Sequence, residues 1–566
     1  MTRSLCWAVL LAIFMSGVTI LSRPLLPVDE TRYLSVAWQA HQDGDYLVSH
    51  LNGETYAHKP PLLFWLINAV WKITGVAVTP ARLVGPAAAI GCLLATSLLA
   101  RRLWPDSPST VQCAPLILVS SMLWMVLFPL TMFDTLMTLA GLSALLGVAR
   151  AADGQFWSGW FIAGISMGLG ILTKGPVILV HVLPTALSVW WWAPQWRGRL
   201  WKWHLGLSSA IGIAAMIGLA WALPAAKSGG PAYANELLFG QTAGRMVESF
   251  AHEQSFWWYL PWLPLCVLPW LLFVPVWRSI SSYQSDRGLK FVLVAALGTL
   301  TIMSLVSGKQ IHYLVPLLPH CAMAFSRLAN RSGQEFVSRR DQLVPAAGTI
   351  VMGIMPLIFN TFAPFGTRAL TGLVADIYCI PFVLCGIALL VRPRQSTPQA
   401  VATIATFSIV FMATVVFALS ATLWDGFDLK PLAEFVRQSN RPTAWYKGYH
   451  GQINFLGHMS VVKELSSETD LGNWLRSTPN AIVVHRLPSG DNKWQDILPT
   501  LRTMDRTTPT AAQQRSISEY LSKHEAFPLS DWGPKVLYVQ WIHSGLLDSP
   551  HLVVIYDDLQ PSAANR

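Results

Sequence analysis

Long apolar runs, separated by short polar stretches, occupy the first three quarters of the 566-residue chain. Most of these runs hold about 18 or more residues, the length that an α-helix needs to cross a ~30 Å hydrocarbon core. No small-residue cleavage site follows the first run, so we interpret it as an uncleaved anchor rather than a signal peptide. The pattern predicts about 13 membrane spans, near residues 5–22, 80–100, 112–130, 134–149, 157–173, 176–193, 206–226, 257–277, 290–307, 312–326, 344–363, 370–391 and 399–420.

A further apolar segment, residues 62–78, is interrupted by Lys72. A charged side chain in the middle of a span is costly. We therefore expect an interfacial helix there, with a true span as the alternative.

The distribution of basic residues sets the orientation of the spans. If the N-terminus is cytoplasmic, every predicted inner loop is basic, whereas the longer outer loops carry few basic residues. This is the asymmetry that the positive-inside rule describes. An odd number of spans then places the C-terminus outside. The inner-loop cations are Arg101, Arg102, Arg150, Arg197, Arg199, Lys202, Arg278, Arg287, Lys290, Arg327, Arg331, Arg339, Arg340, Arg392 and Arg394.

The pattern changes at about residue 424, where the apolar runs shorten to the length of strands. Residues 481–484, 536–539 and 552–556 are such runs, and a helix-like stretch at 516–521 lies between them. This alternation is typical of a small α/β domain. We therefore place a domain boundary between residues 423 and 424.

Composition agrees with this division. Hydrophobic residues make up 53% of the chain and charged residues only 12%, whereas a soluble domain carries roughly 25% charged residues. The fold class is therefore mainly α: a polytopic helical bundle with juxtamembrane helices on the outer side and a small C-terminal α/β domain. The net charge of +10 is explained by the basic inner loops, so we expect no nucleic-acid partner. The seven cysteines lie in or beside apolar segments without a CxxC pair, which favours packing over disulfides or a thiolate metal site.

Most of the remaining ionisable residues gather at the outer ends of the predicted spans. Such groups are expensive at a membrane unless they bind or transform something charged. Their joint placement predicts an outward-facing cavity, lined by carboxylates and cations, that acts on an anionic, lipid-linked substrate. Together with neighbouring polar residues of the same segments, they form the candidate set Asp29, Arg32, Tyr33, His58, Lys59, Asp134, Lys174, Arg245, His252, Lys309 and Tyr313.

Each candidate also has a structural interpretation. The acidic residues could cap helices, the lysines could be snorkelling or interfacial residues, and a lone histidine is more often structural than a ligand. For Asp29 the capping-box version is weakened, because Arg32 stands where Glu or Gln would be needed. The joint placement of the set therefore carries more weight than any single residue.

The first outer loop contains Asp29-Glu30-Thr31-Arg32-Tyr33, Leu51-Asn52-Gly53 and Lys59-Pro60-Pro61-Leu62. Later segments are Phe133-Asp134, Thr173-Lys174-Gly175, residues 240–245 and His312-Tyr313-Leu314. In these motifs, and over essentially all of the membrane part, the chain resembles the C-type, polyprenyl-phosphate-dependent glycosyltransferases. Within that larger, protein O-mannosyltransferase-like family, the resemblance is to the bacterial lipid A aminoarabinose transferases.

The resemblance implies an inverting transfer of aminoarabinose or another amino sugar from undecaprenyl phosphate to lipid A. The reaction would take place on the periplasmic side of the bacterial inner membrane, among membrane lipids. Residues 1–423 would form the transmembrane glycosyltransferase domain, with 23–79 as its first periplasmic loop. Residues 424–566 would form a periplasmic α/β domain. An added amine on lipid A would lower its negative charge, so the resemblance also implies resistance to cationic peptides such as polymyxin.

The resemblance also assigns roles to the candidates. Asp29 corresponds to an essential first-loop carboxylate and Asp134 to the second acidic position, so both are expected to be catalytic. Donor or phosphate binding is expected of the remaining polar set: Arg32, Tyr33, Lys59, Lys174, Arg245, Lys309 and Tyr313.

One position departs from the family pattern. Aminoarabinose transferases carry Glu immediately before the motif Lys, and that Glu helps to hold a metal ion, whereas this chain has His58. We name His58 and His252 as candidate ligands of a divalent metal such as Zn²⁺. Two histidines are an incomplete set of ligands for Zn²⁺, so a metal site would need further ligands.

Elementary chemistry is consistent with the same residues. Breaking an anomeric C–O bond builds positive charge on the sugar and negative charge on the departing phosphate, which carboxylates and cations can stabilise in turn. A phosphate acceptor is already anionic, whereas a hydroxyl acceptor would need Asp29 as a general base. The sequence leaves this choice open.

Three alternatives remain at this stage. The same chemistry could act on a protein hydroxyl or another envelope glycan. A lipid or sugar transporter is less favoured, because transporters place ionisable residues near the bilayer midplane and often show internal repeats. A scaffold without catalytic activity that presents the C-terminal domain would leave the polar cluster unexplained.

Overall fold

The computed structural model describes residues 2–244, 253–280, 286–331, 336–338, short stretches between 341 and 387, and 395–421, 424–487, 535–542 and 551–557. These residues fold into two compact units. The first unit comprises Met1–Arg23, Tyr46–Val48 and Tyr56–Leu419, and the second comprises Pro24–Asp45, Ser49–Thr55 and Ser420–Arg566. Most of residues 24–55, assigned by sequence to the first outer loop, therefore fold with the C-terminal part of the chain.

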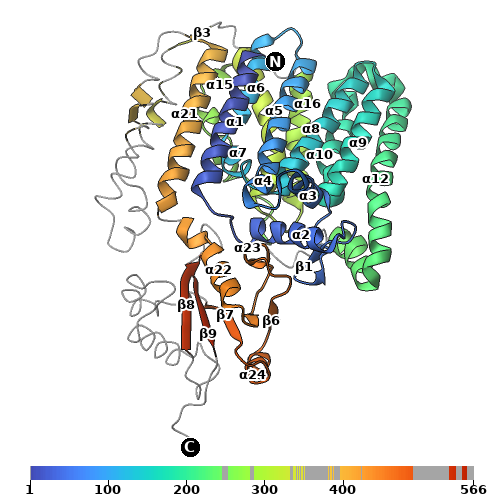
Figure 1. The fold of residues 1–566 in the computed structure, drawn as a ribbon. Helices are drawn as coiled ribbons and strands as arrows, with labels where there is room; N and C mark the ends of the chain where they lie inside the picture. Colours follow the sequence, from blue (N-terminus) through green and yellow to red (C-terminus); the bar gives the residue numbers. More distant parts are fainter. Residues whose placement is uncertain are drawn as a thin grey trace, which may run out of the picture. The chain divides into compact units, whose positions relative to one another are not determined.

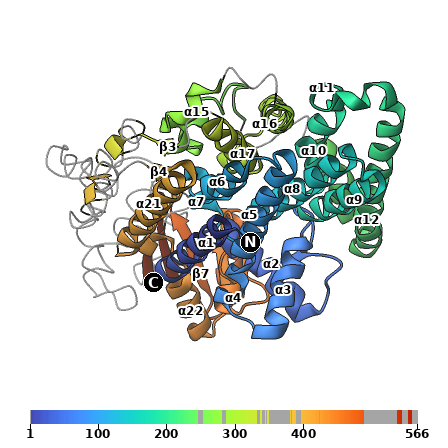
Figure 2. The same ribbon diagram turned by 90° about the horizontal axis from the view of Figure 1, so that it is seen from above.

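The first unit is a bundle of apolar helices, as expected of a multi-pass membrane protein (Figures 1 and 2). Seven helical segments among the described residues are long and apolar enough to cross a membrane. The total of about 13 spans stays a prediction, because most of residues 344–363 and 370–391 lie outside the described part of the chain. The seven segments are Arg3–Ser22, Val78–Leu103, Phe133–Ala152, Phe156–Leu187, Pro194–Gly240, Arg287–Leu305 and Thr397–Ala418.

Some predicted spans are broken into shorter helices. The segment 257–277 is the clearest case, since its prolines remove backbone donors and stop each helix after about one turn. The helix expected at 62–78 does form, but its 13 residues extend only about 20 Å, less than a ~30 Å hydrocarbon core. The interrupted segments are α6 (Pro108–Val119) with α7 (Met122–Leu127), α14 (Leu263–Cys266) with η4 (Trp270–Leu272) and α15 (Pro275–Arg278), and η6 (Ile311–Leu317) with α17 (Leu318–Asn330).

Helices α8 (Phe133–Ala152) and α9 (Phe156–Lys174) pack closely against each other, and α12 (Leu200–Asn235) covers α9 on its other side (Figure 2). Glycines permit this approach: a Cβ atom on Gly159 would lie 2.4 Å from the backbone nitrogen of Ala151, and one on Gly147 would lie 2.6 Å from the Gly159 carbonyl oxygen. Small residues let helices in a membrane approach in this way. The α8–α9 pair fixes the two helix ends that carry Asp134 and Lys174.

The other helices extend the bundle from this pair. α8 packs on α5, α5 on α6, α6 on α17, and α1 packs on α21. The remaining elements of the first unit are α1 (Arg3–Ser22), α3 (Leu62–Thr74), α4 (Val78–Arg82), α5 (Val84–Leu103), η1 (Gly175–Val177), α10 (Ile178–Leu187), α11 (Val189–Trp192), η2 (Pro194–Arg199), α12 (Leu200–Asn235), η3 (Glu236–Gly244), α16 (Arg287–Leu305), β3 (Phe336–Val337), β4 (Gln395–Ser396) and α21 (Thr397–Ala418).

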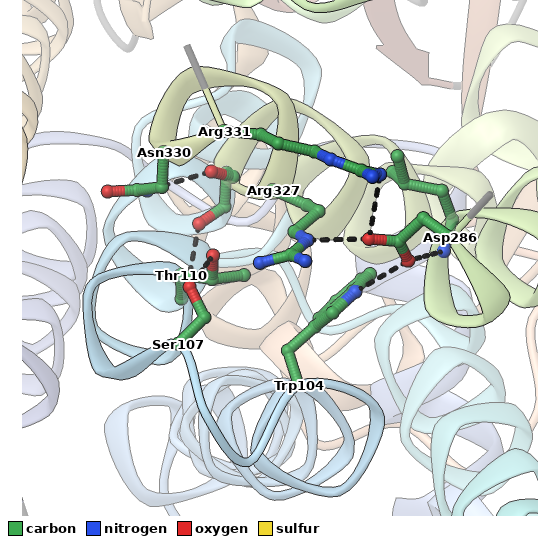
Figure 3. A network of polar contacts seen from close by, with 9 residues as sticks. Trp104, Ser107, Thr110, Asp286, Arg327, Asn330 and Arg331 are labelled. Atoms are coloured by element: carbon green, nitrogen blue, oxygen red, sulfur yellow. Dashed lines mark hydrogen bonds and ion pairs between the residues drawn. The ribbon is translucent and has the colours of Figure 1, made fainter. Parts of the chain in front are cut away.

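Ion pairs join several of the predicted inner loops at one end of this bundle. The carboxylate of Asp286, which caps α16, accepts hydrogen bonds from Trp104 Nε1 at 2.8 Å and Arg327 Nε at 2.7 Å (Figure 3). Nearby, Asp153 pairs with Arg102 at 2.9 Å and with Arg287 at 2.8 Å. Loops that the charge rule places on the same side of the membrane are thus in direct contact.

The second unit is built around a five-stranded sheet of order β6-β5-β7-β9-β8. β5 runs parallel to β6 and β7, whereas β9 is antiparallel to β7 and β8. The three strand-length runs of the sequence lie in β7, β8 and β9, and the stretch 516–521 lies outside the described residues. The C-terminal elements are η8 (Leu419–Ala421), η9 (Trp424–Phe427), α22 (Lys430–Ser439), β5 (Thr443–Tyr446), α23 (Asn454–Gly457), β6 (Lys463–Leu465), α24 (Glu468–Ser477), β7 (Ile482–Leu487), β8 (Lys535–Ile542) and β9 (His551–Asp557).

Two elements from the N-terminal quarter of the chain complete the second unit. They are helix α2 (Asp29–Asp43) and the hairpin of β1 (His50–Leu51) and β2 (Glu54–Thr55). Helix α2 packs on both α23 and β1. The apolar core beneath α22 and α23 includes Leu432, Trp445, Tyr449, Ile453, Val462 and Val484.

We expect Asp286→Asn to destabilise the first unit. Burial alone would raise the pKa of Asp286, but hydrogen bonds from Trp104 and the Leu289 amide, together with Arg327, outweigh it and hold the pKa below its usual value. Breaking such a buried pair costs on the order of 3 kcal/mol. Thermal unfolding in detergent micelles should show a lower midpoint, whereas Lys430→Gln, which removes an exposed pair with Glu434, should leave it nearly unchanged.

The pH dependence of this difference follows from the lowered pKa. A carboxylate whose folded pKa is depressed stabilises the protein above its unfolded pKa of about 3.9. The wild-type advantage over Asp286→Asn should therefore be full above about pH 4 and disappear as the pH falls further, through the lowered folded pKa. An advantage that vanished well above pH 4 would contradict the assignment.

Candidate functional site

Asp134 and Lys174 form a buried ion pair between the first turn of α8 and the last residue of α9. Lys174 Nζ lies 2.7 Å from Asp134 Oδ1, and the two side chains are 15% and 7% exposed, respectively. α8 has no side-chain cap at its N-terminus, so Asp134 acts as an ion-pair partner rather than as a helix cap. Lys174 likewise points to a carboxylate and does not snorkel away.

Tyr313 and Lys59 belong to the same neighbourhood of the first unit. The Lys174 ammonium lies 4.5 Å from the centre of the Tyr313 ring, which η6 contributes. Lys59 lies 6.0 Å from the ring centre of Phe133, the residue before Asp134. The loop before α3, the start of α8, the end of α9 and η6 thus bring four predicted site residues together. Two cations face one carboxylate, an excess of positive charge that suits a phosphate group.

Lys309 is buried and bonded to the backbone. Its ammonium donates to the carbonyl oxygens of Val306 at 2.5 Å and Gln254 at 2.9 Å. Desolvation lowers the pKa of this lysine. The side chain joins the segment at 253–254 to the turn at 306–309, where Glu253 also bridges Gly308. These contacts do not test phosphate binding by Lys309, which stays a prediction. The bonds from its ammonium to the backbone were not expected from the sequence.

His58 makes a contact that the sequence did not predict. Its Nε2 lies 3.4 Å from Oε1 of Glu236, and its ring stacks on Tyr56 with the ring centres 5.1 Å apart. Glu236 stands at the start of η3, 178 residues further along, and has no motif around it. Arg245 and His252 lie outside the described residues. Within the described part of the chain, no three His, Cys, Asp or Glu side chains are grouped to hold a metal ion, so the Zn²⁺ set gains no support and no step is assigned to it.

The remaining candidates lie on α2 in the second unit. Asp29 is the first residue of this helix, and its Oδ1 accepts hydrogen bonds from Arg32 at 2.5 Å and from the Tyr33 hydroxyl at 3.1 Å. The spacings i, i+3 and i, i+4 place these three side chains on one helical face. The Asp29 carboxylate is 43% exposed, so it is oriented by two donors and still accessible.

Glu30 is a buried acid that the sequence analysis passed over. It is 1% exposed, and its Oε2 accepts a hydrogen bond from the Leu26 amide at 3.0 Å. This hydrogen bond fixes the backbone just before α2. It therefore also fixes how the chain enters the helix that begins at Asp29. The adjacent Asp-Glu pair was the available signal, but burial could not be inferred from two neighbouring acids.

The comparisons with known proteins point in the same direction as the motifs. A family described as dolichyl-phosphate-mannose-protein mannosyltransferase matches residues 58–221. An undecaprenyl phosphate-alpha-4-amino-4-deoxy-L-arabinose arabinosyl transferase of Pseudomonas fluorescens is 29% identical over 313 residues, which are 54% of this chain and 55% of that protein. The corresponding transferase of Serratia proteamaculans is 27% identical over 369 residues, 62% of this chain and 63% of that protein. The matched region thus spans less than two thirds of either relative.

The fold is also found among solved structures. The crystal structure of ArnT from Cupriavidus metallidurans bound to undecaprenyl phosphate aligns with a TM-score of 0.71 over 97% of each chain, at 16% identity. The apo structure of the same protein aligns with a TM-score of 0.70. The chain therefore resembles these transferases in sequence over its matched region and in fold over nearly its whole length.

The Asp134–Lys174 pair should behave as one unit in stability measurements. Lys174→Met would leave a buried carboxylate without its cation, a change that costs about 3–5 kcal/mol. The double variant Asp134→Asn/Lys174→Met should recover most of that loss, because neither charge remains. Thermal unfolding of wild type, both single variants and the double variant gives the coupling. If the losses in stability of the two single variants simply add up in the double variant, the two groups do not interact.

Proposed function

We propose that this protein is an inverting glycosyltransferase that moves aminoarabinose, or a closely related amino sugar, from undecaprenyl phosphate to a phosphate of lipid A. The observation that carries the proposal is the sequence match to undecaprenyl phosphate-aminoarabinose transferases. The fold shared with an undecaprenyl-phosphate-bound structure supports it. So does the group of two cations, one acid and one tyrosine in the first unit.

The reaction exchanges one phosphate ester at the anomeric carbon for another. The C–O bond between the sugar and undecaprenyl phosphate breaks, and its electron pair leaves with the phosphate oxygen. An oxygen of the acceptor phosphate forms the new bond from the opposite face, which inverts the configuration. No proton needs to be removed from an anionic acceptor, so the residues mainly stabilise charge and position the reactants.

The two groups of side chains suit two parts of this chemistry. Lys59 and Lys174 supply positive charge for the departing undecaprenyl phosphate, with Asp134 holding Lys174 in place and Tyr313 lying under its ammonium. Asp29 is accessible and carries negative charge, so we assign it to the sugar, where positive charge develops. Arg32 and Tyr33 orient that carboxylate. Arg245 is assigned to the phosphate as well, on the resemblance alone.

The proposed function also implies in which membrane the protein lies and which side its site faces. The basic loops joined by Asp153 and Asp286 would face the cytoplasm of a bacterial inner membrane. Asp134 and Lys174, at the other ends of α8 and α9, would then face the periplasm, where lipid-linked sugar and lipid A are both reachable from the outer leaflet. Membrane lipids would surround the first unit.

A protein hydroxyl is the second candidate acceptor, because the matching family is described as protein mannosyltransferases. A protein hydroxyl must lose its proton on transfer, and Asp29 would then act as general base. The sugar donor and the phosphate-binding residues would be unchanged. The products of the reaction separate the two acceptors.

Mass spectrometry of lipid A tests the proposal directly. A deletion strain should lack a pentosamine adduct that wild type restores, and Asp29→Ala should fail to restore it, since one carboxylate near the reacting carbon is worth at least about 100-fold in rate. Glu434→Gln, which changes an exposed acid on α22, serves as the control and should restore the adduct. A lipid A profile that stays unchanged in the deletion strain would exclude lipid A as acceptor.

Lys59→Met should weaken donor binding. Loss of one charged contact to a phosphate corresponds to about a tenfold increase in Kd, measurable by titration of the purified protein with undecaprenyl phosphate. Lys59→Arg should bind within about threefold of wild type because it keeps the charge. Lys72→Met, on the neighbouring helix α3, is the matched control. Equal affinities of Lys59→Met and Lys72→Met would remove Lys59 from the phosphate site.

A further inference from the structure

We infer that the C-terminal α/β domain positions Asp29: residues 449–462 hold helix α2 through Ser35 and hold the β1–β2 hairpin through Asn52. Ser35, Asn52 and Asn454 are therefore positioning residues for the transfer reaction. This inference rests on the proposed function, in which Asp29 faces the reacting sugar. It gives the C-terminal domain a role that its own sequence does not suggest.

Ser35 is the first anchor. It lies six residues after Asp29 on α2, about 9 Å along the helix axis, and it is 1% exposed. Its hydroxyl donates to the Gly451 carbonyl oxygen at 2.7 Å and accepts from the Phe455 amide at 3.2 Å. One buried hydroxyl thus connects the middle of α2 to the backbone on both sides of residue 453.

Asn52 is the second anchor, at the tip of the β1–β2 hairpin. Its amide group exchanges two hydrogen bonds with the backbone of Val462: Nδ2 donates to the carbonyl oxygen at 2.8 Å, and Oδ1 accepts from the amide at 2.7 Å. Asn454 Nδ2 donates to the same Oδ1 at 3.1 Å. This pairing continues the backbone pattern of a strand through a side chain.

The hairpin is in turn tied back to α2. The Gly53 amide donates to Oε1 of Gln39, on α2, at 3.1 Å. Trp38 of α2 packs edge-on against Phe455 and His458, with ring centres 6.2 Å and 5.1 Å away. Helix, hairpin and the 449–462 segment therefore support one another.

Asn454 connects these anchors to the core of the domain. It is 3% exposed, and its Oδ1 accepts a hydrogen bond from the Tyr449 hydroxyl at 2.6 Å. Tyr449 packs in the core with Trp445 of β5. A continuous path of contacts leads from the sheet to the helix that begins with Asp29.

Positioning is needed because α2 is short. A helix of 15 residues is marginal in isolation, and the Asp29 carboxylate is tied by side-chain bonds to the first turn of that same helix. Any rotation or shift of α2 therefore moves Asp29, Arg32 and Tyr33 together. A misplacement of about 1 Å at a reacting centre can lower the rate about 100-fold.

The test uses the full-length protein with Ser35→Ala/Asn52→Gly. Asn52 has a positive φ of 56°, so glycine removes its side chain without straining the backbone. Asn440→Gly is the matched control, since Asn440 also has a positive φ, 49°, and closes α22 away from α2. Asn454→Ala gives the same test from the side of the domain.

Amide hydrogen exchange is the first readout and does not depend on activity. In Ser35→Ala/Asn52→Gly the amides of α2 should exchange at least about tenfold faster, whereas those of β5 and β7 keep the wild-type rate. Asn440→Gly should leave α2 unchanged. Wild-type exchange in α2 of the double variant would overturn the inference.

Kinetics give the second readout. The double variant should lose about 10- to 100-fold in kcat with the donor KM within about twofold of wild type. In an Asp29→Asn background the same two changes should cause no further loss, because there is no carboxylate left to position. An equal further loss would mean a general structural role. If the wild type transfers no sugar to any lipid acceptor, the proposed function fails, and the exchange measurement alone decides whether the domain holds α2.

Discussion

The first unit depends on pairing its charges at the ends of helices. α8 shows this most clearly: Asp134 in its first turn pairs with Lys174, and Asp153, which follows its last residue, pairs with Arg102 and Arg287. The two acids are separated by about 30 Å of helix, which is the thickness of a hydrocarbon core. An unpaired charge in this interior would be strongly unfavourable. The apolar length between the two pairs therefore fixes where each end of α8 lies relative to a membrane.

The same constraint explains which parts of the structure could be predicted. The basic loops predicted to share one side do meet, in the Asp286 network (Figure 3) and in the ion pairs of Asp153. Asp29, Arg32 and Tyr33 stand at the spacings i, i+3 and i, i+4, so a helix brings them to one face, and the structure adds the hydrogen bonds. These features follow from periodicity, charge sign and span length, all of which are local properties of a sequence.

Contacts between distant segments were not predictable in the same way. His58 meets Glu236, and Ser35 meets the backbone at Gly451 and Phe455, with no pattern at either end to link them. The three hydrogen bonds of Asn52 depend on a left-handed backbone conformation that Asn adopts more readily than most residues, but Leu51-Asn52-Gly53 alone gives no hint of its partner. Lys309, which the sequence analysis assigned to phosphate binding, also donates to three backbone carbonyls that its sequence context gave no reason to expect.

The two candidate carboxylates differ in a way that bears on their roles. Asp134 is buried, and a lysine ammonium engages it directly, so most of its charge is already balanced. Asp29 is half-exposed, and its partners approach from its own helix, which leaves a second oxygen for other contacts. Charge stabilisation at a reacting carbon requires an accessible carboxylate held at a fixed angle. Asp29 meets that requirement, whereas Asp134 is better suited to holding Lys174 beside Tyr313. A transporter usually places its ionisable groups near the bilayer midplane, whereas Asp134 lies at the end of a helix long enough to span the membrane.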